Sequence, residues 1–488
     1  MRMILCIAFC LGAFLGFGQD TLSFLKVGDF GSEEGVEIVS FNDSTYYILA
    51  NTADEFNNSD YQLIPYNPDI GVSSAVNYGT LNSDRALDLT CRDPKIFVVG
   101  MTNGNTASYE GFVHGIEGDS LSFQYYWGTG VANTWWQASQ IEVIDTIIYV
   151  LFEDVNQKEV PQLHKLSLSG QPIEAIELEG LVGANFSELH FDEHTQTLRA
   201  CGKRLNQAAN QDAFFYAFDL QLEEQWSYVF EEDGDEVFTD FARLNDTSVI
   251  IVGYTNSLFE EDDDILVIRL NELSLSPDSI LVQGYDSGNV VNRDDRAYGV
   301  FIDNDTIFIT GETQTYGQGG VDGYITLLNP DLIPIPRGST FGTPGDDYSF
   351  TLHKDGNALF GVGTTYERTK GLSDVLLWRR DAFDNTTLFT SVEDFFLVST
   401  GLVLNTEELV GDASNEEGLF ANIEQGGFRL KSSIWDRTNE VQVYNSIGQR
   451  VTDLNSFKEE VYGLPSGVYF LLYKGDFSEV STTKFFIP

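Results

Sequence analysis

The densest group of side chains that could do chemistry is the acidic run at residues 260–264. Two glutamates are followed there by Asp262, Asp263 and Asp264. Hard cations, Ca²⁺ above all, bind where several carboxylate oxygens lie close together. The run therefore predicts a calcium site with these three aspartates as ligands.

Acids also recur along the chain in two repeated settings, each at the start of an apolar strand. A repeated acid can instead accept hydrogen bonds from loop backbone amides, once per repeat. A single binding site does not need a copy in every repeat, so the repetition favours this structural role over cation binding. The first set is Asp60, Glu110, Asp212, Asp264, Asp322 and Asp374, and the second is Glu33-Glu34, Asp84, Asp235-Glu236, Asp294-Asp295 and Asp346-Asp347.

Tryptophans offer a second kind of site. Trp135 and Trp136 stand where other repeats have the acidic pair, and Trp127 directly follows two tyrosines. Such an aromatic patch can stack on sugar rings or on a partner protein. Aromatic residues also fill junctions between structural units, and both roles stay open.

Other catalytic or metal-binding patterns are weak. His190 and His194 have a zinc-motif spacing, but that spacing brings two imidazoles together only on a helix. The residues between them, Phe191 to Glu193, indicate a turn, so zinc is not expected. The sequence contains no nucleophile elbow and no phosphate-binding loop. Paired carboxylates for glycoside chemistry are compatible with the composition, although no pair can be singled out.

The bulk composition excludes some partners. The chain has 488 residues, with 75 Asp and Glu against 27 Lys and Arg, a formal net charge of -48. A surface of this kind repels nucleic acids and anionic lipids. Hydrophobic residues make up 42%, including 36 Phe and 22 Tyr, so the chain can bury a large core.

One apolar strand recurs seven times and ends at a small residue in most copies. Its spacing leaves room for four strands, a to d, in each copy, which is one blade of a β-propeller. The end residues, taken as anchors, are Ala50, Gly100, Leu151, Gly202, Gly253, Gly311 and Gly363, with gaps of 50, 51, 51, 51, 58 and 52 residues. The sequence therefore predicts an all-β fold with a seven-bladed propeller over residues 19–381.

The ring is expected to close through its first strand. Residues 21–27 resemble an outer strand d that precedes the first complete blade. We predict that this strand completes the seventh blade, which removes the free sheet edge. The a–b turns are tight and the b–c loops are long, for example at residues 256–262. Long loops on a rigid ring usually carry binding, so the face that holds the b–c and d–a connections is the expected place for a site.

The N-terminus is typical of a signal peptide at residues 1–18. A basic start is followed by an apolar run from Ile4 to Phe17 and a small-residue end at Gly18. No later stretch has about 18 consecutive apolar residues, so no membrane span is expected. Cys91 and Cys201 remain after cleavage, and the repeat places them two blades apart, which predicts two free thiols.

The repeats resemble the bacterial SBBP-type β-propeller repeats over about residues 21–381. The likeness is carried by Asp346-Asp347-Tyr348, by the strand end Gly363-Thr364 and by the run from Gly319 to Tyr324. It is good in blades 2, 5, 6 and 7 and poor in blades 3 and 4. The resemblance implies a fold and no particular reaction.

A polar linker is predicted at residues 382–418, followed by a small β-sandwich at 419–488. The residues of this last segment that form a recognisable pattern are Tyr444, Gly448, Leu464, Gly467, Tyr469 and Lys484. Through them the segment resembles the type A C-terminal sorting domain of the Bacteroidetes type IX secretion system, although the usual Pro-Asn-Pro opening is absent. The resemblance implies export by that machinery and a location outside the cell or on the outer membrane.

Two classes of function follow from these patterns. The preferred one is a non-catalytic binding or adhesion protein that is secreted or displayed at the cell surface, with a glycan or a surface protein as ligand. The alternative is an extracellular hydrolase or lyase that acts on glycans through an acidic pocket on the same face. Neither nucleic acid nor a membrane span is expected for either class.

Overall fold

The computed structural model describes most of residues 22–381 and seven short strands beyond them. The signal-peptide prediction and nearly all of the predicted linker lie outside the described residues. Within 22–381 the residues left out are 29–31, 43, 54–58, 68–70, 74, 81–82, 104–107, 129–134, 207, 209, 258–261, 284–292, 316–319, 343–344, 350, 356–357 and 367–372. Contacts divide the chain into two compact units, Met1–Ile64 with Val76–Asp394, and Pro65–Ala75 with Phe395–Pro488.

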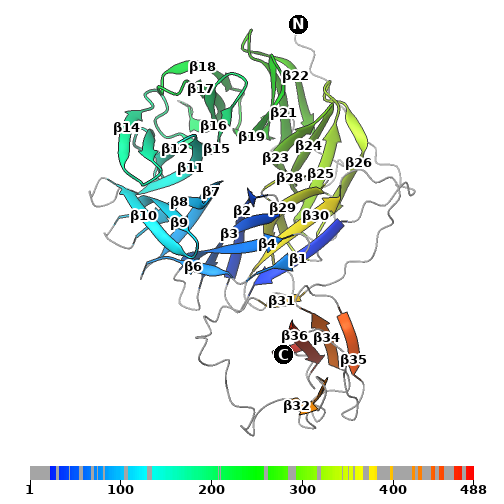
Figure 1. Cartoon of the computed structure of the whole chain (residues 1–488). Coiled ribbons are helices and arrows are strands. Elements are labelled where there is room, and N and C mark those ends of the chain that lie inside the picture. Colours follow the sequence, from blue (N-terminus) through cyan, green and yellow to red (C-terminus); the bar gives the residue numbers. More distant parts are fainter. Residues whose placement is uncertain are drawn as a thin grey trace. The chain divides into compact units, whose positions relative to one another are not determined.

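The first unit contains seven antiparallel sheets arranged around a central axis, as Figure 1 shows. Each sheet is one blade, with strand a nearest the axis and strand d outermost. Blade 1 has β2 (Ser32–Asn42), β3 (Thr45–Ala53), β4 (Ser59–Asn67) and β6 (Val76–Tyr78). Blade 2 has β7 (Asp84–Arg92), β8 (Lys95–Thr102), β9 (Glu110–Glu117) and β10 (Ser120–Trp127). Blade 3 has β11 (Trp136–Ile144), β12 (Ile147–Asp154), β13 (Gln162–Ser167) and β14 (Pro172–Glu177).

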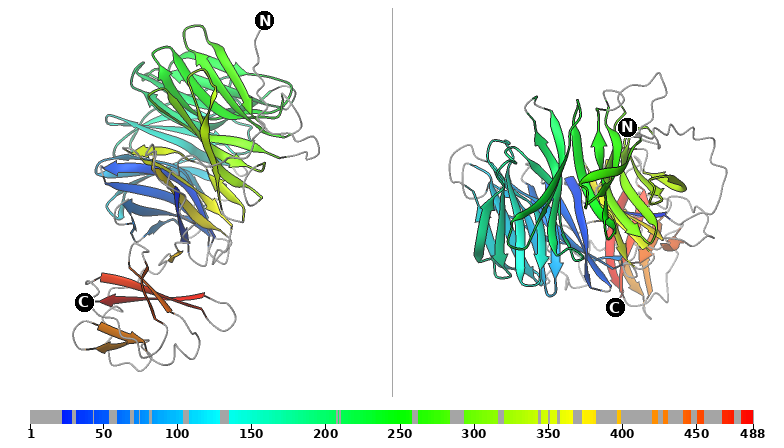
Figure 2. Two further views of the ribbon diagram at one scale, coloured as in Figure 1. Left: turned by 90° about the vertical axis from the view of Figure 1, so that its right-hand side faces the viewer. Right: turned by 90° about the horizontal axis from the view of Figure 1, so that it is seen from above.

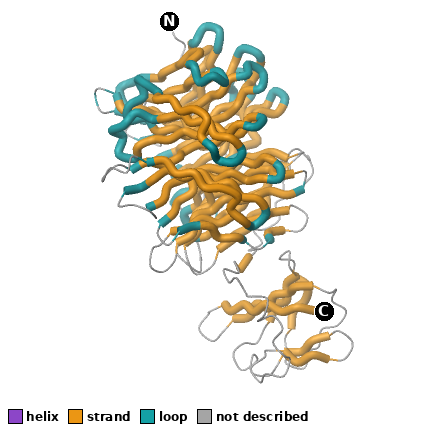
Figure 3. Tube along the Cα trace, turned by 60° about the vertical axis from the view of Figure 1, so that its left-hand side comes forward, coloured by secondary structure: helices purple, strands orange, loops and turns teal. Residues whose placement is uncertain are grey.

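The remaining blades repeat this plan, and Figure 3 shows that strands joined by loops make up the described chain. Blade 4 has β15 (Asn185–Asp192), β16 (Thr197–Leu205), β17 (Gln211–Phe218) and β18 (Glu224–Phe230). Blade 5 has β19 (Glu236–Asn245), β20 (Ser248–Thr255), β21 (Asp264–Asn271) and β22 (Ser276–Gln283). Blade 6 has β23 (Asp295–Asp303), β24 (Thr306–Thr313), β25 (Asp322–Leu328) and β26 (Pro334–Phe341). Blade 7 has β27 (Asp347–Ser349) and β28 (His353–Asp355), which together form strand a, then β29 (Ala358–Thr365) and β30 (Asp374–Asp381).

The seventh blade is completed by the first strand of the chain, as the sequence predicted. Strand β1 (Leu22–Gly28) pairs antiparallel with β30, with Leu22 opposite Arg380 and Val27 opposite Val375. Strand β2 of blade 1 then contacts β29 and β30 of blade 7, so the ring is closed. A closed ring leaves no blade with an unpacked face.

The hydrophobic core consists of clusters that lie between neighbouring blades. The cluster between blades 2 and 3 joins Phe97 and Val99 to Trp136 and Phe152. The cluster between blades 6 and 7 joins Phe308 and others to Trp378, which is fully buried. Because each apolar side chain of a central strand packs against the next sheet, single blades are expected to be unstable alone.

A β-bulge in strand a explains why the anchors are small. The pairing register of strands a and b shifts at the same place in six blades, for example between Ala86 and Asp88. Next to the bulge the strand a backbone approaches strand b, and a Cβ added at Gly253 would lie 1.8 Å from the Val237 carbonyl oxygen. Blade 3 corrects one anchor, because Phe152 and not Leu151 pairs with Ala138 before the bulge.

The strands run between two faces of the ring, which the right-hand view of Figure 2 shows. We call the face with the b–c and d–a connections the loop face and the opposite one the turn face. The a–b connections are tight on the turn face, such as residues 304–305, whereas b–c connections such as 256–263 are longer. No described segment forms a helix that is long and apolar enough to cross a bilayer.

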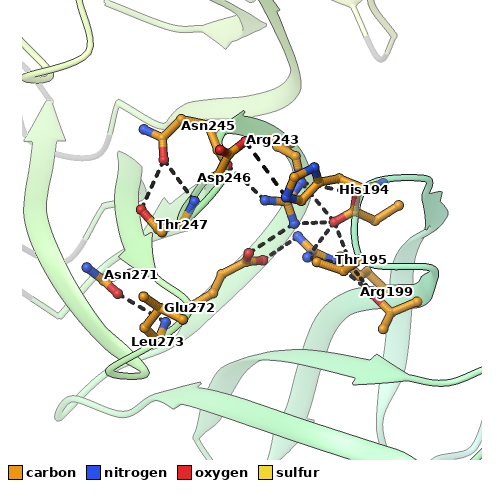
Figure 4. A network of polar contacts seen from close by, with 12 residues as sticks. His194, Thr195, Arg199, Arg243, Asn245, Asp246, Thr247, Asn271, Glu272 and Leu273 are labelled. Carbon is orange, nitrogen blue, oxygen red and sulfur yellow. Dashed lines mark hydrogen bonds and ion pairs between the residues drawn. The ribbon is translucent and has the colours of Figure 1, made fainter.

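A buried group of four charged residues joins blades 4 and 5 near the turn face (Figure 4). Arg199 on β16 pairs with Asp192 and Glu272, and its side chain is only 2% exposed. Arg243 on β19 also binds both acids, reaching Glu272 at 2.9 Å. Arg199 additionally lies over the ring of Trp226, 5.7 Å from its centroid. The two arginines and the two acids of this group are thus paired with one another across the two blades.

The two cysteines of the propeller are free thiols, as predicted. Cys201 is buried on β16 of blade 4, and Cys91 is half-buried on β7 of blade 2. Burial raises the pKa of Cys91 to about 12. Both therefore stay protonated and unreactive at neutral pH.

The second unit is described by its strands. A four-stranded antiparallel sheet has the order β35 (Arg450–Leu454), β34 (Val441–Asn445), β36 (Gly467–Lys474) and β37 (Val480–Ile487), and β32 (Phe420–Ile423) pairs with β33 (Gly427–Leu430). Strand β31 (Phe396–Val398) lies within the predicted linker, and β5 (Gly71–Val72) pairs with Tyr66 and Asn67. Among the residues of the predicted sorting signal, Tyr444 pairs with Phe470, and Lys484 also lies opposite Phe470. Tyr469 pairs with Phe485 and Gly467 with Ile487, whereas Gly448 and Leu464 lie outside the described residues.

Candidate functional site

Several of the repeated acids of the loop face hold loop backbone, as the repetition suggested. The first acid of the pair before strand a accepts a backbone N–H at the start of strand c in the preceding blade. Asp235 accepts the N–H of Gln211 at 2.8 Å, and Asp346 accepts that of Val321 at 3.1 Å. The same bond recurs in blade 6, where Asp294 accepts the N–H of residue 263 at 3.3 Å. These carboxylates therefore connect neighbouring blades.

The three aspartates of the predicted calcium site have separate partners. Asp262 accepts the backbone N–H of Arg293 at 3.1 Å, whereas Asp263 accepts a hydrogen bond from Arg296 Nε at 2.7 Å. Asp264 is buried at the start of β21. Among the described residues no group of three or more His, Cys, Asp or Glu side chains could hold a metal ion, and residues 260 and 261 lie outside that part. Calcium binding at this loop stays a prediction.

The three tryptophans of the predicted aromatic patch lie in different surroundings. Trp135 is 41% exposed on the loop face, and its ring lies 5.0 Å from that of Tyr109. Trp136 is only 2% exposed in the core between blades 2 and 3. Trp127 packs against His164, with ring centroids 4.7 Å apart. Trp135 is the most exposed of the three, whereas Trp127 is partly buried and packs with the buried Trp136 at the junction of blades 2 and 3.

The two histidines with zinc-motif spacing have separate ion-pair partners. His190 Nδ1 lies 3.2 Å from Glu142 Oε2, and His194 Nε2 lies 3.7 Å from Asp246 Oδ1. A turn at residues 193–196 separates them along the chain, as the sequence predicted. A turn of this kind does not direct both imidazoles at one point.

Four carboxylates face one another around the axis, and we call them the axial carboxylates. They are Glu37, Asp88, Glu188 and Asp240, each directly after the bulge of its strand a. Asp240 accepts the backbone N–H of Val300 in blade 6 at 2.6 Å, and Asp88 accepts that of Ile141 in blade 3 at 2.8 Å. The sequence patterns did not indicate this group, because the bulge that aligns it is visible only in the pairing register.

Burial and mutual repulsion make these acids hard to ionise. Burial, and then the charge of Asp88, raises the pKa of Glu37 to about 8. Burial raises the pKa of Asp88 to about 8, against the backbone N–H groups that it accepts. Burial raises the pKa of Asp240 to about 7 and, together with the charges of Asp240 and Asp88, raises that of Glu188. The axis therefore holds protons near neutral pH.

The residue that follows the anchor on strand b lies near the loop face. In blades 1, 3 and 7 its side chain forms a hydrogen bond with the backbone of the next blade. In blade 1 it is Asn51, whose side chain bonds the N–H of Ala86 in blade 2 at 2.8 Å. In blade 3 it is Glu153, which accepts the N–H of Phe186 in blade 4 at 2.7 Å. In blade 7 it is Thr364, whose hydroxyl accepts an N–H of blade 1 at 3.2 Å.

Blades 4, 5 and 6 depart from this pattern. Their residues at the same position are Lys203, Tyr254 and Glu312. Within the part of the chain that the structure describes, none of the three bonds the backbone of the next blade. A position that bonds the next blade in blades 1, 3 and 7, and is Met101 in blade 2, thus carries a cation, a phenol and a carboxylate in three successive blades, which is a sign of a binding surface.

Arg296 organises this surface. Its guanidinium donates to Asp263 at 2.7 Å, to Glu312 at 3.0 Å and to Asp294 at 2.8 Å. It also lies over the ring of Tyr254, 5.3 Å from the centroid. The three carboxylates share one cation, so charge-assisted hydrogen bonds fix their positions relative to one another.

Further tyrosines extend the surface into blade 7. Tyr298 donates to Glu312 at 2.9 Å. The rings of Tyr348 and Tyr366 meet edge to face at 5.8 Å, and Tyr366 is 52% exposed. Burial, and then the charges of Asp346 and Glu312, raises the pKa of Tyr348, which places its ring beside the Arg296 network. The rim cluster is defined here as Lys203, Tyr254, Asp263, Asp294, Arg296, Tyr298, Glu312, Tyr348 and Tyr366.

The sequence patterns named only two members of the rim cluster as site or loop residues, Asp263 and Asp294. A signal for the others exists in the repeat itself. When the seven blades are aligned on their anchors, with Phe152 in blade 3, the next residue is Asn51, Met101, Glu153, Lys203, Tyr254, Glu312 or Thr364. Lys203 is the single cation in this series, which distinguishes it without any structure.

Comparison with known proteins shows no family. No family model matches the chain, and no curated protein does so at a significant level. The β-propeller domain of the Trilobed protease from Pyrococcus furiosus is similar to it, with 10% identity and a TM-score of 0.41, over 74% of this chain and all of that one. A puromycin-hydrolyzing peptidase of Mycobacterium tuberculosis has 11% identity and a TM-score of 0.47, over 93% of this chain and 61% of that one. Quinohemoprotein alcohol dehydrogenase from Pseudomonas putida HK5 has 9% identity and a TM-score of 0.42, over 78% and 77%.

Proposed function

We propose that this chain is a secreted or surface-displayed binding protein that takes a glycan at the rim cluster. The observation that carries the proposal is the departure of blades 4 to 6 from the structural pattern of the ring. Four tyrosines, an arginine and carboxylates with fixed partners lie together there on the loop face. Tyrosine rings offer apolar faces to sugar rings, and fixed carboxylates and hydroxyls accept hydrogen bonds from sugar hydroxyls.

The contacts of the acids in the cluster favour binding over hydrolysis. Glycoside hydrolysis requires one carboxylic acid that donates a proton and a second, ionised carboxylate. Asp263, Asp294 and Glu312 all accept hydrogen bonds from the one guanidinium of Arg296. Burial raises the pKa of Asp263 and of Glu312 against the effect of Arg296, but the common partner of all three acids is a fixed cation. The cluster is therefore better suited to hold a sugar than to cleave one.

Export is the second part of the proposal. It rests on the signal-like residues 1–18 and on the resemblance of residues 419–488 to a type IX sorting domain, in a segment where the strands that hold Tyr444 and Lys484 each pair with β36. The finer assignment of the propeller to SBBP-type repeats is part of the same proposal. Secretion to the medium or retention at the outer surface is checked by fractionation of cells with and without residues 419–488.

Glycan binding is tested with the substitution Tyr366→Ala. The wild-type chain should bind a subset of a glycan array, and Tyr366→Ala should weaken that binding about tenfold, which corresponds to one stacked aromatic ring of about 1.4 kcal/mol. Trp135→Ala is the matched control, because Trp135 is an exposed aromatic residue on the same face. Loss of binding in the Trp135 variant alone would place the site at blades 2 and 3. Cleavage of a bound glycan by the wild-type chain would overturn the non-catalytic assignment.

A further inference from the structure

Lys203 is the one member of the rim cluster whose charge has no direct partner. It lies half-buried at the loop-face end of β16, opposite Asn185. Within the described residues its ammonium forms no hydrogen bond and no ion pair within 4 Å. The other cation of the cluster, Arg296, binds three carboxylates, and Arg204, one residue further along β16, binds Glu231 at 3.2 Å.

The acids closest to Lys203 are already engaged. Asp235, Glu153 and Asp263 are the carboxylates whose charges act on it, although none lies within ion-pair distance. Glu153 accepts the N–H of Phe186, and Asp235 accepts that of Gln211. Asp263 binds Arg296. An ammonium carries three donors and no acceptor, so Lys203 holds donors that no described neighbour satisfies.

We propose that Lys203 binds the carboxylate of an acidic sugar, a uronic-acid residue, within the glycan that occupies the rim cluster. This inference rests on the proposed function. A carboxylate satisfies the ammonium donors with charge-assisted hydrogen bonds. Arg296 lies over the neighbouring Tyr254 ring, which is partly buried, and we expect the part of this ring that Arg296 does not cover to pack against the same sugar.

The acidity of the chain limits the ligand further. The protein has a net charge of -48 and therefore repels a polyanion. Salt screens this repulsion beyond a distance of about 8 Å at physiological ionic strength. A single carboxylate next to Lys203 lies within that screening length of a cation. The ligand is therefore a largely neutral glycan with isolated uronic-acid residues and not a polyuronate.

The test compares two probes on the full chain: an oligosaccharide capped by glucuronic acid, and the same oligosaccharide after reduction of its carboxyl group to an alcohol. Calorimetry should show that the wild-type chain binds the acidic probe about 10- to 100-fold more tightly than the reduced one. Lys203→Met should remove this difference by weakening binding of the acidic probe to about the level of the reduced one. Lys203→Arg, which keeps the charge, should retain most of the preference.

The possible results separate the two proposals. Equal binding of both probes by the wild-type chain, unchanged in Lys203→Met, would overturn the role of Lys203 while glycan binding stands. Binding of neither probe, together with a blank glycan array, would overturn the proposed function and this inference with it. The melting temperature of Lys203→Met should equal or exceed that of the wild type, because the substitution removes no ion pair. A fall in that temperature together with equal loss of both probes would show a structural role instead.

Discussion

Arg199→Met is expected to lower the free energy of unfolding by about 3–5 kcal/mol, because it leaves buried carboxylates with too little positive charge. The side chains of Asp192 and Glu272 are each 8% exposed, and Arg243 alone would have to serve both. Burial by itself would raise the pKa of Asp192, but Arg243 and Arg199 outweigh it and hold the pKa at about 2. Chemical denaturation of the full chain at pH 7 measures the loss.

Arg204→Met is the matched control for this substitution. Arg204 lies on the same strand, but its ion pair with Glu231 is exposed, since the Glu231 side chain is 61% accessible. Removal of an exposed pair should cost no more than about 1 kcal/mol. Addition of Glu272→Gln to Arg199→Met should recover part of the stability, because it removes one unpaired charge. A loss in Arg199→Met no greater than in Arg204→Met would contradict the proposed importance of the buried group.

The stability of the propeller should also fall as pH rises from about 5 to about 9. The axial carboxylates have folded-state pKa values of about 7 to 8 for Glu37, Asp88 and Asp240, against about 4 in an unfolded chain. The folded chain therefore holds more protons over this window than the unfolded chain. Each such group can cost up to about 1.4 kcal/mol per pH unit until the folded pKa is passed. Melting temperatures measured by calorimetry across this range test the sign.

Other titratable groups also affect how the stability of the propeller depends on pH. Glu142 and His190 face the axial carboxylates, and the charge of His190 favours ionisation of Asp240. His114 and His164 have the opposite effect at lower pH, because burial lowers the pKa of each to about 4. The stability that these two neutral histidines contribute to the fold is lost as pH falls from about 6.5 to 4. They therefore do not change the pH dependence of stability above about pH 6.5.

The substitution Glu188→Gln tests how much the axial carboxylates contribute to the pH dependence of stability. Glu188 accepts no hydrogen bond from any described residue, so glutamine replaces its volume without breaking a contact. The variant should be more stable than the wild type at pH 9 and should show a flatter dependence on pH. Glu117→Gln, at an exposed position of β9, is the control and should leave the curve unchanged. Identical curves for Glu188→Gln and the wild type would contradict the assignment.

The repeat made the architecture predictable from sequence. The small anchors recur because strand a approaches strand b at the bulge, as at Gly100, where a Cβ would lie 2.0 Å from the Arg85 carbonyl oxygen. The closing strand was visible because residues 21–27 look like strand d. Blade 3 was misplaced by one residue because Phe152 stands where a small anchor is expected, so the pattern offered no marker there.

The candidate site was less predictable, for a physical reason. Acids were prominent in the sequence, yet a carboxylate that holds a backbone amide and one that holds a ligand look the same. Asp262 and Asp263 were grouped because they are adjacent, but neighbouring residues of an extended chain point in different directions, and each found its own partner. Lys203 and Tyr254 come together only through the ring, about 50 residues apart, which no local motif records.

The pairing of β1 with β30 also sets the order of events in folding. Leu22 is opposite Arg380, so the first strand of the propeller can pair only after its last strand, β30, has been synthesised. At ordinary rates of synthesis the partner emerges on the order of tens of seconds later. Such a contact has a very large sequence separation, and its formation carries a high loop-closure entropy. Closure of the ring is therefore expected to be the slow and final step, and until it occurs the outer strand of blade 7, β30, lacks its partner β1.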